Sequence, residues 1–394
     1  MNKWTLMKVM IKKRIDGCKF LLACMATKQD DFVLFQSFDG ASYSDNPRFI
    51  SEKLHELYPN VKIVWAFKNP DTKKNIVPDY VRKIKLDESF EYYKELASCK
   101  VWVNNFSFKY IPKRKGQFFI QTWHGDRAFK KVLNDSGHRE KGNLVSESIK
   151  GYCNLAICGS LYGERQYRSA FGYEGKILME GTPRDDLLLE PDEEKIKEIK
   201  AKLNVAQDTK LLLFAPTFRQ ANQLGKTEQE TSSIDISRVL DALEKKYGGE
   251  WKGVLRAHPA VAGLTGNRSD PRIIDATKYE DMADLLLTSD VLITDYSSCA
   301  GDFALLGRLL LLYQPDRKEY ESNDRALYFK MEDSPYYIAE NQHELEENIL
   351  CSSKEAIRKN CEQILQFYGT KETGKSSEMV AEIIHESVSN CSGR

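Results

Sequence analysis

Two histidines stand where a parallel α/β sheet would place catalytic groups. His124 follows the apolar segment 118–122, and His258 follows the apolar segment 253–257. Ligands of open α/β sheets bind beyond the carboxyl ends of the strands, so both imidazoles are expected in a substrate site. We predict that His124 accepts a proton from an attacking hydroxyl and that a protonated His258 stabilises charge on a pyrophosphate. A structural His124 bonded to a loop carbonyl is the alternative.

A hydroxyl and two guanidinium groups near further strand ends suit the oxygens of a phosphate. Thr217 and Arg219 follow the apolar run 211–215, and Arg256 stands two residues before His258. Guanidinium groups bind phosphate oxygens through paired, charge-assisted hydrogen bonds. We therefore predict that all three residues bind the phosphate groups of a donor substrate. The alternatives are an Arg219 that pairs with a neighbouring loop and an Arg256 that strand alternation turns away.

The run Thr-Asp-Tyr-Ser-Ser at 294–298 leads from an apolar strand into a segment of small residues. Ser297 and Ser298 fall at the expected start of a helix, where free backbone N–H groups and the helix dipole favour an anion. Both hydroxyls are predicted to bind a donor phosphate, which is compatible with simple helix capping. Asp302, one turn later, is predicted to bind a ribose diol. Asp295 is predicted to orient the donor loop.

Strands that alternate with helices must position these groups. Short apolar runs at 32–36, 61–67, 100–104, 118–122 and 155–158 are separated by polar or helical segments. The same alternation restarts at 211–215 and continues to 309–313. Such alternation is typical of a parallel sheet with helices on both faces. The predicted fold class is α/β, with two Rossmann-like doubly wound domains that face a cleft, as in GT-B transferases.

The Lys/Glu-rich segment 190–204 contains Pro191 and is the natural place for a domain boundary. We predict an N-terminal basic helix at 1–29, an acceptor domain at 30–189, a donor domain at 190–365 and a C-terminal tail at 366–394.

Composition narrows the class of protein. The chain has 394 residues, and its 58 basic residues balance 58 acidic residues, so no overall field attracts nucleic acid. The nine cysteines include no Cys-x-x-Cys pair, which favours reduced thiols over a disulfide frame or a zinc site. The dinucleotide fingerprint and the P-loop pattern are absent, so neither a nicotinamide cofactor nor ATP-driven chemistry is predicted. No metal site is predicted.

The N-terminal segment is basic and amphipathic. Apolar residues recur at steps of three and four, at Trp4, Met7, Ile11, Ile15, Cys18 and Leu22, among six basic residues before position 20. A helix of this kind can lie in an anionic membrane surface. The alternative is a helix packed on its own domain. No stretch approaches the roughly 20 apolar residues that span a bilayer.

Several motifs together resemble the CDP-glycerol glycerophosphotransferases of teichoic acid and capsule synthesis. They are Gln-Thr-Trp-His-Gly at 121–125, Gly-Thr-Pro-Arg-Asp-Asp at 181–186, Ala-Pro-Thr-Phe-Arg at 215–219, and Thr-Asp-Tyr-Ser-Ser at 294–298. The segments 35–38 and 44–47 also match, and the resemblance covers roughly residues 30–350.

The resemblance implies a GT-B fold, a CDP-polyol donor, no obligatory cofactor and peripheral attachment to the inner membrane face. It also implies that His124 and His258 are catalytic and that Ser297 and Ser298 contact donor phosphate. One departure is the run Asp126-Arg-Ala-Phe-Lys-Lys131, where the family usually has Thr-Pro followed by a hydrophobic residue and lysines. We therefore assign Gly125, Asp126, Arg127 and Lys130 to the acceptor side, with an acceptor preference of their own.

The predicted activity is transfer of glycerol phosphate from CDP-glycerol to a hydroxyl of a lipid-linked or polymeric glycan, with release of CMP. The predicted location is the cytoplasmic, inner face of the cell membrane. A CDP-ribitol transferase, a nucleotide-sugar GT-B glycosyltransferase and a non-catalytic membrane-bound scaffold are the alternatives. Donor polyol, acceptor, linkage, number of units added and oligomeric state stay open at this point.

Overall fold

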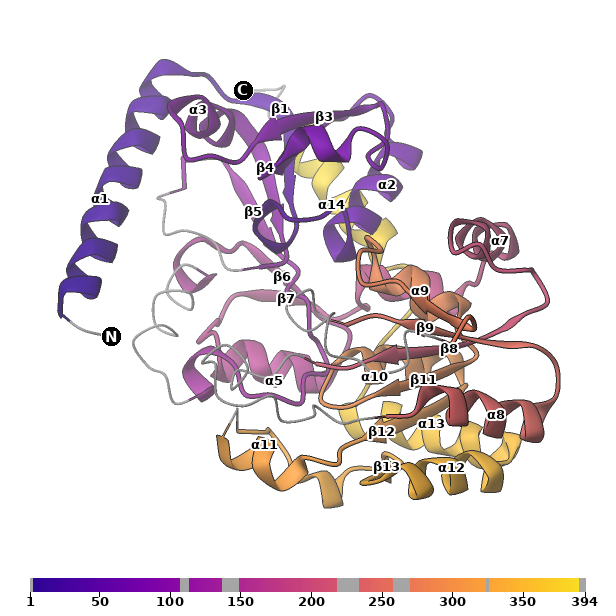
Figure 1. The fold of residues 1–394 in the computed structure, drawn as a ribbon. Helices are drawn as coiled ribbons and strands as arrows, with labels where there is room; N and C mark the ends of the chain where they lie inside the picture. The colour runs from indigo at the N-terminus through magenta and orange to yellow at the C-terminus, as the bar shows by residue number, and fades with distance from the viewer. Residues whose placement is uncertain are drawn as a thin grey trace. The chain divides into compact units, whose positions relative to one another are not determined.

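The computed structural model describes residues 3–106, 113–136, 149–217, 234–257, 270–323 and 326–389. The chain forms two compact units. Unit 1 comprises Met1–Asp126, Val132–Asp186 and Lys371–Arg394, and unit 2 comprises Arg127–Lys131 and Leu187–Thr370. Each unit is described by itself below, with the labels of Figure 1.

Unit 1 is built on a seven-stranded sheet in the order β3-β2-β1-β4-β5-β6-β7, and every pair is parallel. The strands are β1 (Asp30–Gln36), β2 (Lys62–Phe67), β3 (Val81–Lys85), β4 (Cys99–Asn104), β5 (Phe118–Gln121), β6 (Leu155–Ile157) and β7 (Lys176–Leu178). The helices are α1 (Lys3–Ala26), α2 (Asp45–Leu57), α3 (Phe90–Ser98), α5 (Leu161–Ser169) and α14 (Ser376–Ser389), with α6 (Asp186–Leu189) at the junction with unit 2.

Both faces of this sheet are buried, which explains why its central strands are continuous apolar runs. Val33 and Phe35 of β1 join one core with residues of α2 and α14. Their neighbours Phe32 and Leu34 join a second core with residues of α1 and α3. Successive side chains of a strand point to opposite faces, so a strand covered on both sides must be apolar throughout.

Unit 2 is built on a six-stranded parallel sheet in the order β10-β9-β8-β11-β12-β13. The strands are β8 (Lys210–Ala215), β9 (Trp251–Leu255), β10 (Ile273–Asp275), β11 (Val291–Thr294), β12 (Leu309–Tyr313) and β13 (Ile338–Ala339). The helices are α7 (Glu193–Lys202), α8 (Ile236–Tyr247), α9 (Met282–Thr288), α10 (Cys299–Phe303), α11 (Arg317–Asn323), α12 (Gln342–Cys351) and α13 (Lys354–Tyr368). The prediction of two doubly wound parallel α/β domains is confirmed.

Two segments belong to a different unit than their position in the chain suggests. Residues 127–131 pack with unit 2, where the buried ring of Phe129 lies 5.3 Å from Phe329 and 5.2 Å from Tyr336. The segment expected as a polar tail, 366–394, contains α14, which lies beside α2 in unit 1 (Figure 1). Its residues Val380, Ala381, Ile384 and Val388 are buried. Apolar side chains at steps of three and four give this helix a face that must be covered.

Helix α1 forms as expected, and its two faces have different surroundings. Phe20 and Ala23 are buried in the core shared with α3, and the Lys12 ammonium lies 2.8 Å from the Glu88 carboxylate. The predicted apolar stripe lies on the other side, and its members Trp4, Met7, Ile11, Ile15 and Leu22 are exposed. Packing against the protein therefore does not explain the stripe. No described helix combines the length and the apolar character that crossing a bilayer requires.

Candidate active site

His124 lies just beyond the carboxyl end of β5, as predicted. Its Nδ1 atom is 2.7 Å from the main-chain carbonyl oxygen of Asn105. A carbonyl oxygen only accepts hydrogen bonds, so Nδ1 carries the hydrogen and the lone pair of the neutral ring is on Nε2. His124 is thus bonded to a loop carbonyl, and this bond leaves Nε2 in the form that a general base needs.

Aromatic rings surround the His124 imidazole and remove water from it. Ring centroids of Phe38, Phe106 and Trp123 lie 5.3, 5.4 and 4.3 Å from that of His124. This burial lowers the pKa of His124 below its usual 6.5, while the Asn105 carbonyl and the Asp45 carboxylate oppose the shift and Arg184 adds to it. A lowered pKa keeps the ring neutral at neutral pH, which is the protonation state of a base.

A buried polar network holds the loops around His124. The Asn105 side chain donates to the Asp45 carboxylate at 2.5 Å, and the Arg184 guanidinium donates to the same carboxylate at 2.9 Å. Asn46 accepts from the Arg184 main-chain N–H at 3.1 Å and donates to the Trp123 carbonyl at 3.0 Å. Charged groups are buried in proteins when they are paired, and the Asp45–Arg184 pair meets that condition.

Backbone strain is concentrated in the same loops. Phe38, Asp39, Asp45 and Trp123 all have positive φ angles, between 44° and 60°. Each residue of this kind costs on the order of 1–3 kcal/mol, and such residues gather at active sites where the surroundings enforce them. The loops that follow β1 and β5 are therefore built to a fixed shape around His124.

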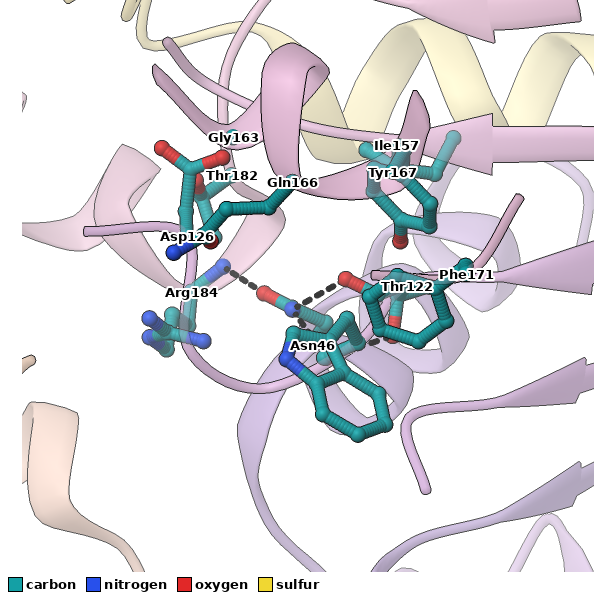
Figure 2. Close-up of a pocket in the computed structure, with 11 residues that line it drawn as sticks. Asn46, Thr122, Asp126, Ile157, Gly163, Gln166, Tyr167, Phe171, Thr182 and Arg184 are labelled. Carbon is teal, nitrogen blue, oxygen red and sulfur yellow. Dashed lines mark hydrogen bonds between the residues drawn. The ribbon is translucent and has the colours of Figure 1, made fainter. Parts of the chain in front are cut away.

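Figure 2 shows a small pocket of unit 1, and Thr122, Trp123 and Asp126, which flank His124 in the chain, are among the residues that line it. Asn46, Asp126, Gln166 and Arg184 are among the polar residues that line it. Its volume of about 10 Å³ is room for roughly one water molecule. The Asp126 carboxylate accepts from the Gly159 N–H at 3.2 Å, and Gly125 is buried as well. The residues around the pocket thus hold the loop in place, and the pocket itself is too small to bind a glycan.

The Gly-Thr-Pro-Arg-Asp-Asp motif at 181–186 is clamped by the C-terminal segment of unit 1. Glu372 accepts from the Thr182 N–H at 2.7 Å and from the Thr182 hydroxyl at 2.9 Å. Asp186 accepts from the N–H groups of Ser376 and Ser377 at the start of α14. These bonds fix the backbone that presents Arg184 to Asp45.

In unit 2, the Asp295 carboxylate bonds to main-chain groups of two strand-end loops. Its carboxylate accepts from the Thr217 N–H at 3.0 and 3.1 Å and from the Tyr296 N–H at 2.6 Å. Gln314 donates to the Asp295 carbonyl at 2.9 Å. The ends of β8 and β11 are joined in this way, and Thr217 and the serine pair are held on neighbouring loops.

Ser297 and Ser298 are half-buried at the start of α10. Ser298 is the N-cap residue and its side chain makes no capping hydrogen bond, while Ser297 Oγ accepts a long 3.4 Å bond from the Cys299 N–H. Helix α10 has only five residues, so its dipole is small. Hydroxyls and local N–H groups, more than the helix dipole, would bind an anion here.

Arg127 and Asp302 form a buried ion pair within unit 2, with Nη1 and Oδ1 2.6 Å apart. Arg127 is fully buried, and a Cβ atom at Gly301 would lie 2.6 Å from its Cδ. Only glycine therefore fits beside the Arg127 stem. This pair links residues 127–131 to α10; the predicted acceptor contact of Arg127 and the predicted ribose contact of Asp302 stay predictions.

The other predicted site residues either interact with neighbouring groups or lie outside the described residues. The Arg256 guanidinium donates to the Tyr279 carbonyl, and burial lowers its pKa. Lys130 pairs through its main chain with Leu327, and its ammonium lies 5.6 Å from the centre of the Tyr320 ring. Arg219 and His258 lie outside the described residues. No cluster of three or more potential metal ligands occurs in the described part of the chain.

Residues 19–386 match the sequence profile of the family described as CDP-Glycerol:Poly(glycerophosphate) glycerophosphotransferase. The chain belongs to this family. The resemblance inferred from the motifs is thereby confirmed.

Several members of this glycerophosphotransferase family align with 90% or more of this chain. A teichoic acid poly(glycerol phosphate) polymerase of Bacillus spizizenii is 29% identical over 94% of this chain and 95% of its own length. A polymerase of the same description from Staphylococcus epidermidis is 31% identical over 90% of this chain, which spans about half (50%) of that longer protein. A teichoic acid ribitol-phosphate primase of B. spizizenii is 30% identical over 95% of this chain and 96% of its own length.

The solved structure of the wall teichoic acid polymerase TagF is similar to the chain throughout. It has a TM-score of 0.81 and 29% identity, and the match covers 100% of both chains. A TagF variant soaked with CDPG matches at a TM-score of 0.81 and 28% identity. The predicted GT-B fold class is confirmed by this likeness and by the two parallel sheets.

Sequence reasoning about this family member missed the support of the predicted base. The motif segments 44–47 and 181–186 were recognised, but no role was given to Asp45, Asn46 or Arg184. Asn105, directly after β4, was missed completely. The available signal was the polar run Asn104-Asn105 at the carboxyl end of a buried strand that neighbours β5.

Proposed function

We propose that the chain transfers glycerol phosphate from CDP-glycerol to a hydroxyl of a teichoic-acid-type acceptor and releases CMP. Family membership and the names of the relatives support this donor and this class of product. The observation that carries the mechanism is the bond from His124 Nδ1 to the Asn105 carbonyl, since it leaves Nε2 as a neutral base.

The reaction is a single displacement at phosphorus. His124 Nε2 takes the proton of the acceptor hydroxyl, whose oxygen forms a bond to the phosphorus that carries glycerol. The bond from that phosphorus to the bridging pyrophosphate oxygen breaks, and CMP leaves with the bridging oxygen and its electrons. His258, Ser297, Ser298 and Arg219 neutralise the charge on the leaving group. Protein dipoles placed where charge develops are a large source of rate enhancement.

A His124→Ala variant tests this assignment. Loss of a general base typically costs about 10²–10⁴-fold in rate, so acceptor-dependent CMP release should fall by that factor while the fold is retained. If the intact protein releases no CMP even when an acceptor is added, the scaffold alternative is favoured. A variant with near-normal turnover would exclude His124 as the base.

CDP-ribitol is the second candidate donor, because a ribitol-phosphate primase is among the full-length relatives. Parallel assays with CDP-glycerol, CDP-ribitol and nucleotide sugars separate the candidates. We expect the highest kcat/KM with CDP-glycerol, in agreement with the family description. Equal or higher turnover of CDP-ribitol would reassign the donor.

Peripheral attachment to the inner face of the cell membrane is part of the proposed function. It is supported by the exposed stripe of α1, which carries Trp4, Met7, Ile11 and Ile15 on a basic helix. A helix of this composition binds anionic lipid by burying its apolar side chains and attracting the headgroups. A lipid-linked acceptor would then be presented at the same surface.

A further inference from the structure

We propose that Asp45 and Arg184, joined as a buried ion pair, are positioning residues for the proton abstraction performed by His124. This inference rests on the proposed role of His124 as the base. Neither residue contacts the imidazole through a described hydrogen bond. Each acts on His124 through one intermediate asparagine.

The first connection runs through Asn105. The main-chain carbonyl of Asn105 accepts the His124 Nδ1 hydrogen, while its side-chain amide donates to Asp45 Oδ2 at 2.5 Å and to Ser37 Oγ at 3.1 Å. Its side-chain oxygen accepts from the Phe38 N–H at 2.8 Å. Asn105 is fully buried and is fixed at both ends. The Asp45 carboxylate therefore fixes the carbonyl that sets the tautomer and the orientation of the ring.

The second connection runs through Asn46. Its side-chain oxygen accepts from the Arg184 N–H at 3.1 Å, and its amide nitrogen donates to the Trp123 carbonyl at 3.0 Å and to the Thr122 carbonyl at 3.3 Å (Figure 2). These carbonyls belong to the two residues before His124. The segment that carries Arg184 thereby fixes the backbone from which the imidazole projects.

The ion pair links the two connections, because Asp45 belongs to the first and Arg184 to the second. Arg184 Nη1 lies 2.9 Å from Asp45 Oδ1, and the two side chains are only 8% and 7% exposed. Asp45 holds a φ of 60° at the first residue of α2, a conformation that a non-glycine residue adopts only under constraint. That constraint directs both carboxylate oxygens, one to Arg184 and one to Asn105.

The pair also brings two opposite charges to bear on the imidazole. Asp45 raises the pKa of His124, and Arg184 lowers it. Other charges in the described part of unit 1 are Asp185, whose Oδ1 is 3.7 Å from Arg184 Nε, Asp39, which pairs with Lys68 at 3.0 Å, and Asp126, which accepts from the Gly159 N–H at 3.2 Å. The nearer side chains around the ring, from Phe38, Phe106 and Trp123, carry no charge. Removing the charge of Asp45 and removing the charge of Arg184 should therefore shift the pKa of His124 in opposite directions.

The test is the pH dependence of kcat/KM for Asp45→Asn, Arg184→Gln and the double variant. A base works unprotonated, so the acid limb of the profile follows the pKa of the free enzyme's base. We expect Asp45→Asn to move this limb to lower pH and Arg184→Gln to move it to higher pH. The neutral double variant should have a limb near that of the wild type. Each variant should lose roughly 10- to 100-fold in kcat because the base is misplaced, with the KM for CDP-glycerol unchanged.

Two further variants make the result decisive. Glu95→Gln removes the exposed Arg82–Glu95 pair of the same unit and should leave the profile unchanged. Arg184→Lys retains the cation, so its limb should stay closer to that of the wild type than the limb of Arg184→Gln. If Asp45→Asn does not fold, the acid limbs of the double variant and of the two Arg184 variants still test the positioning role. The double variant is expected to fold because a buried pair replaced on both sides leaves no unpaired charge.

The two hypotheses fail in different ways. If His124→Gln keeps normal turnover, the proposed base is wrong. If His124→Gln is inactive while Asp45→Asn and Arg184→Gln shift the limb in the same direction, or do not shift it, the ion pair is only structural and the positioning role is wrong.

Discussion

At the scale of single residues, the described structure distinguishes side chains with a polar atom that lacks a strong polar partner from charged side chains that are paired with each other. His124 has one ring nitrogen bonded to a carbonyl and the other in the form of a base. Ser298 caps a short helix without a side-chain capping bond. By contrast, Arg127 and Asp302 are buried against each other. The residue types alone did not distinguish these cases, because an arginine beside a strand end serves phosphate binding or support equally well.

Substitution of Gly301 tests whether the buried packing of Arg127 against α10 stabilises the protein. Gly301→Ala would place a Cβ atom 2.6 Å from Arg127 Cδ, so the buried side chain must move. Overpacking of this kind typically costs about 1–3 kcal/mol, and we expect that loss in the free energy of unfolding measured with urea. The matched control is Gly17→Ala in α1, where a Cβ atom meets nothing within 4 Å. The control should stabilise by roughly 0.5–1 kcal/mol, and equal effects of the two substitutions would contradict this account.

At the scale of elements, helix α1 has one face packed on unit 1 and one exposed apolar stripe. The sequence predicted the helix and its stripe because a period of three to four residues is visible in the chain itself. Which face packs on the domain was not predictable, since that depends on the partner α3. The core side chains Phe20 and Ala23 lie outside the predicted stripe.

Vesicle binding tests the exposed face. Replacing Trp4 and Ile11 by glutamate removes apolar area and adds negative charge, so co-flotation with vesicles that contain phosphatidylglycerol should fall at least about tenfold. Activity on a soluble acceptor analogue should be unchanged, because both side chains are exposed. The charge-matched control also adds two negative charges, but outside α1, by exchange of the exposed Gln207 and Gln363 for glutamate, and it should bind as the wild type does. Undiminished flotation of the glutamate variant would contradict membrane contact through α1.

At the scale of the whole molecule, the fold class was predictable and the division of the chain was less so. Continuous apolar strands alternate with helices, and this pattern requires parallel sheets covered on both faces. The sequence did not indicate that residues 127–131 join unit 2 or that 371–394 join unit 1. Likewise, Asp45 and Arg184 meet across 139 residues of chain, and no local pattern links them. His124, the proposed base, was predicted because strand ends are local features of the sequence, whereas the hydrogen-bond network around it was missed because it is assembled by the fold.

Truncation tests the division of the chain. Removal of residues 371–394 deletes α14 and exposes the core that Val380 and Ile384 fill. Each fully buried side chain of this kind contributes about 1.5–3 kcal/mol, so unit 1 should lose its cooperative unfolding transition in calorimetry. Removal of residues 390–394 alone should leave the transition in place. An unchanged melting profile after the longer deletion would show that α14 is dispensable.

The membership of α14 in unit 1 has a consequence for synthesis on the ribosome. The seven strands of unit 1 are translated before those of unit 2, yet α14, which covers one face of their sheet together with α2, is translated after all of them. The chain of unit 2 can therefore be complete while one apolar face of the unit 1 sheet is still only partly covered. Exposed surface of this kind makes nascent chains prone to aggregate. The order of translation and the order of completion are thus reversed for the two units of this chain.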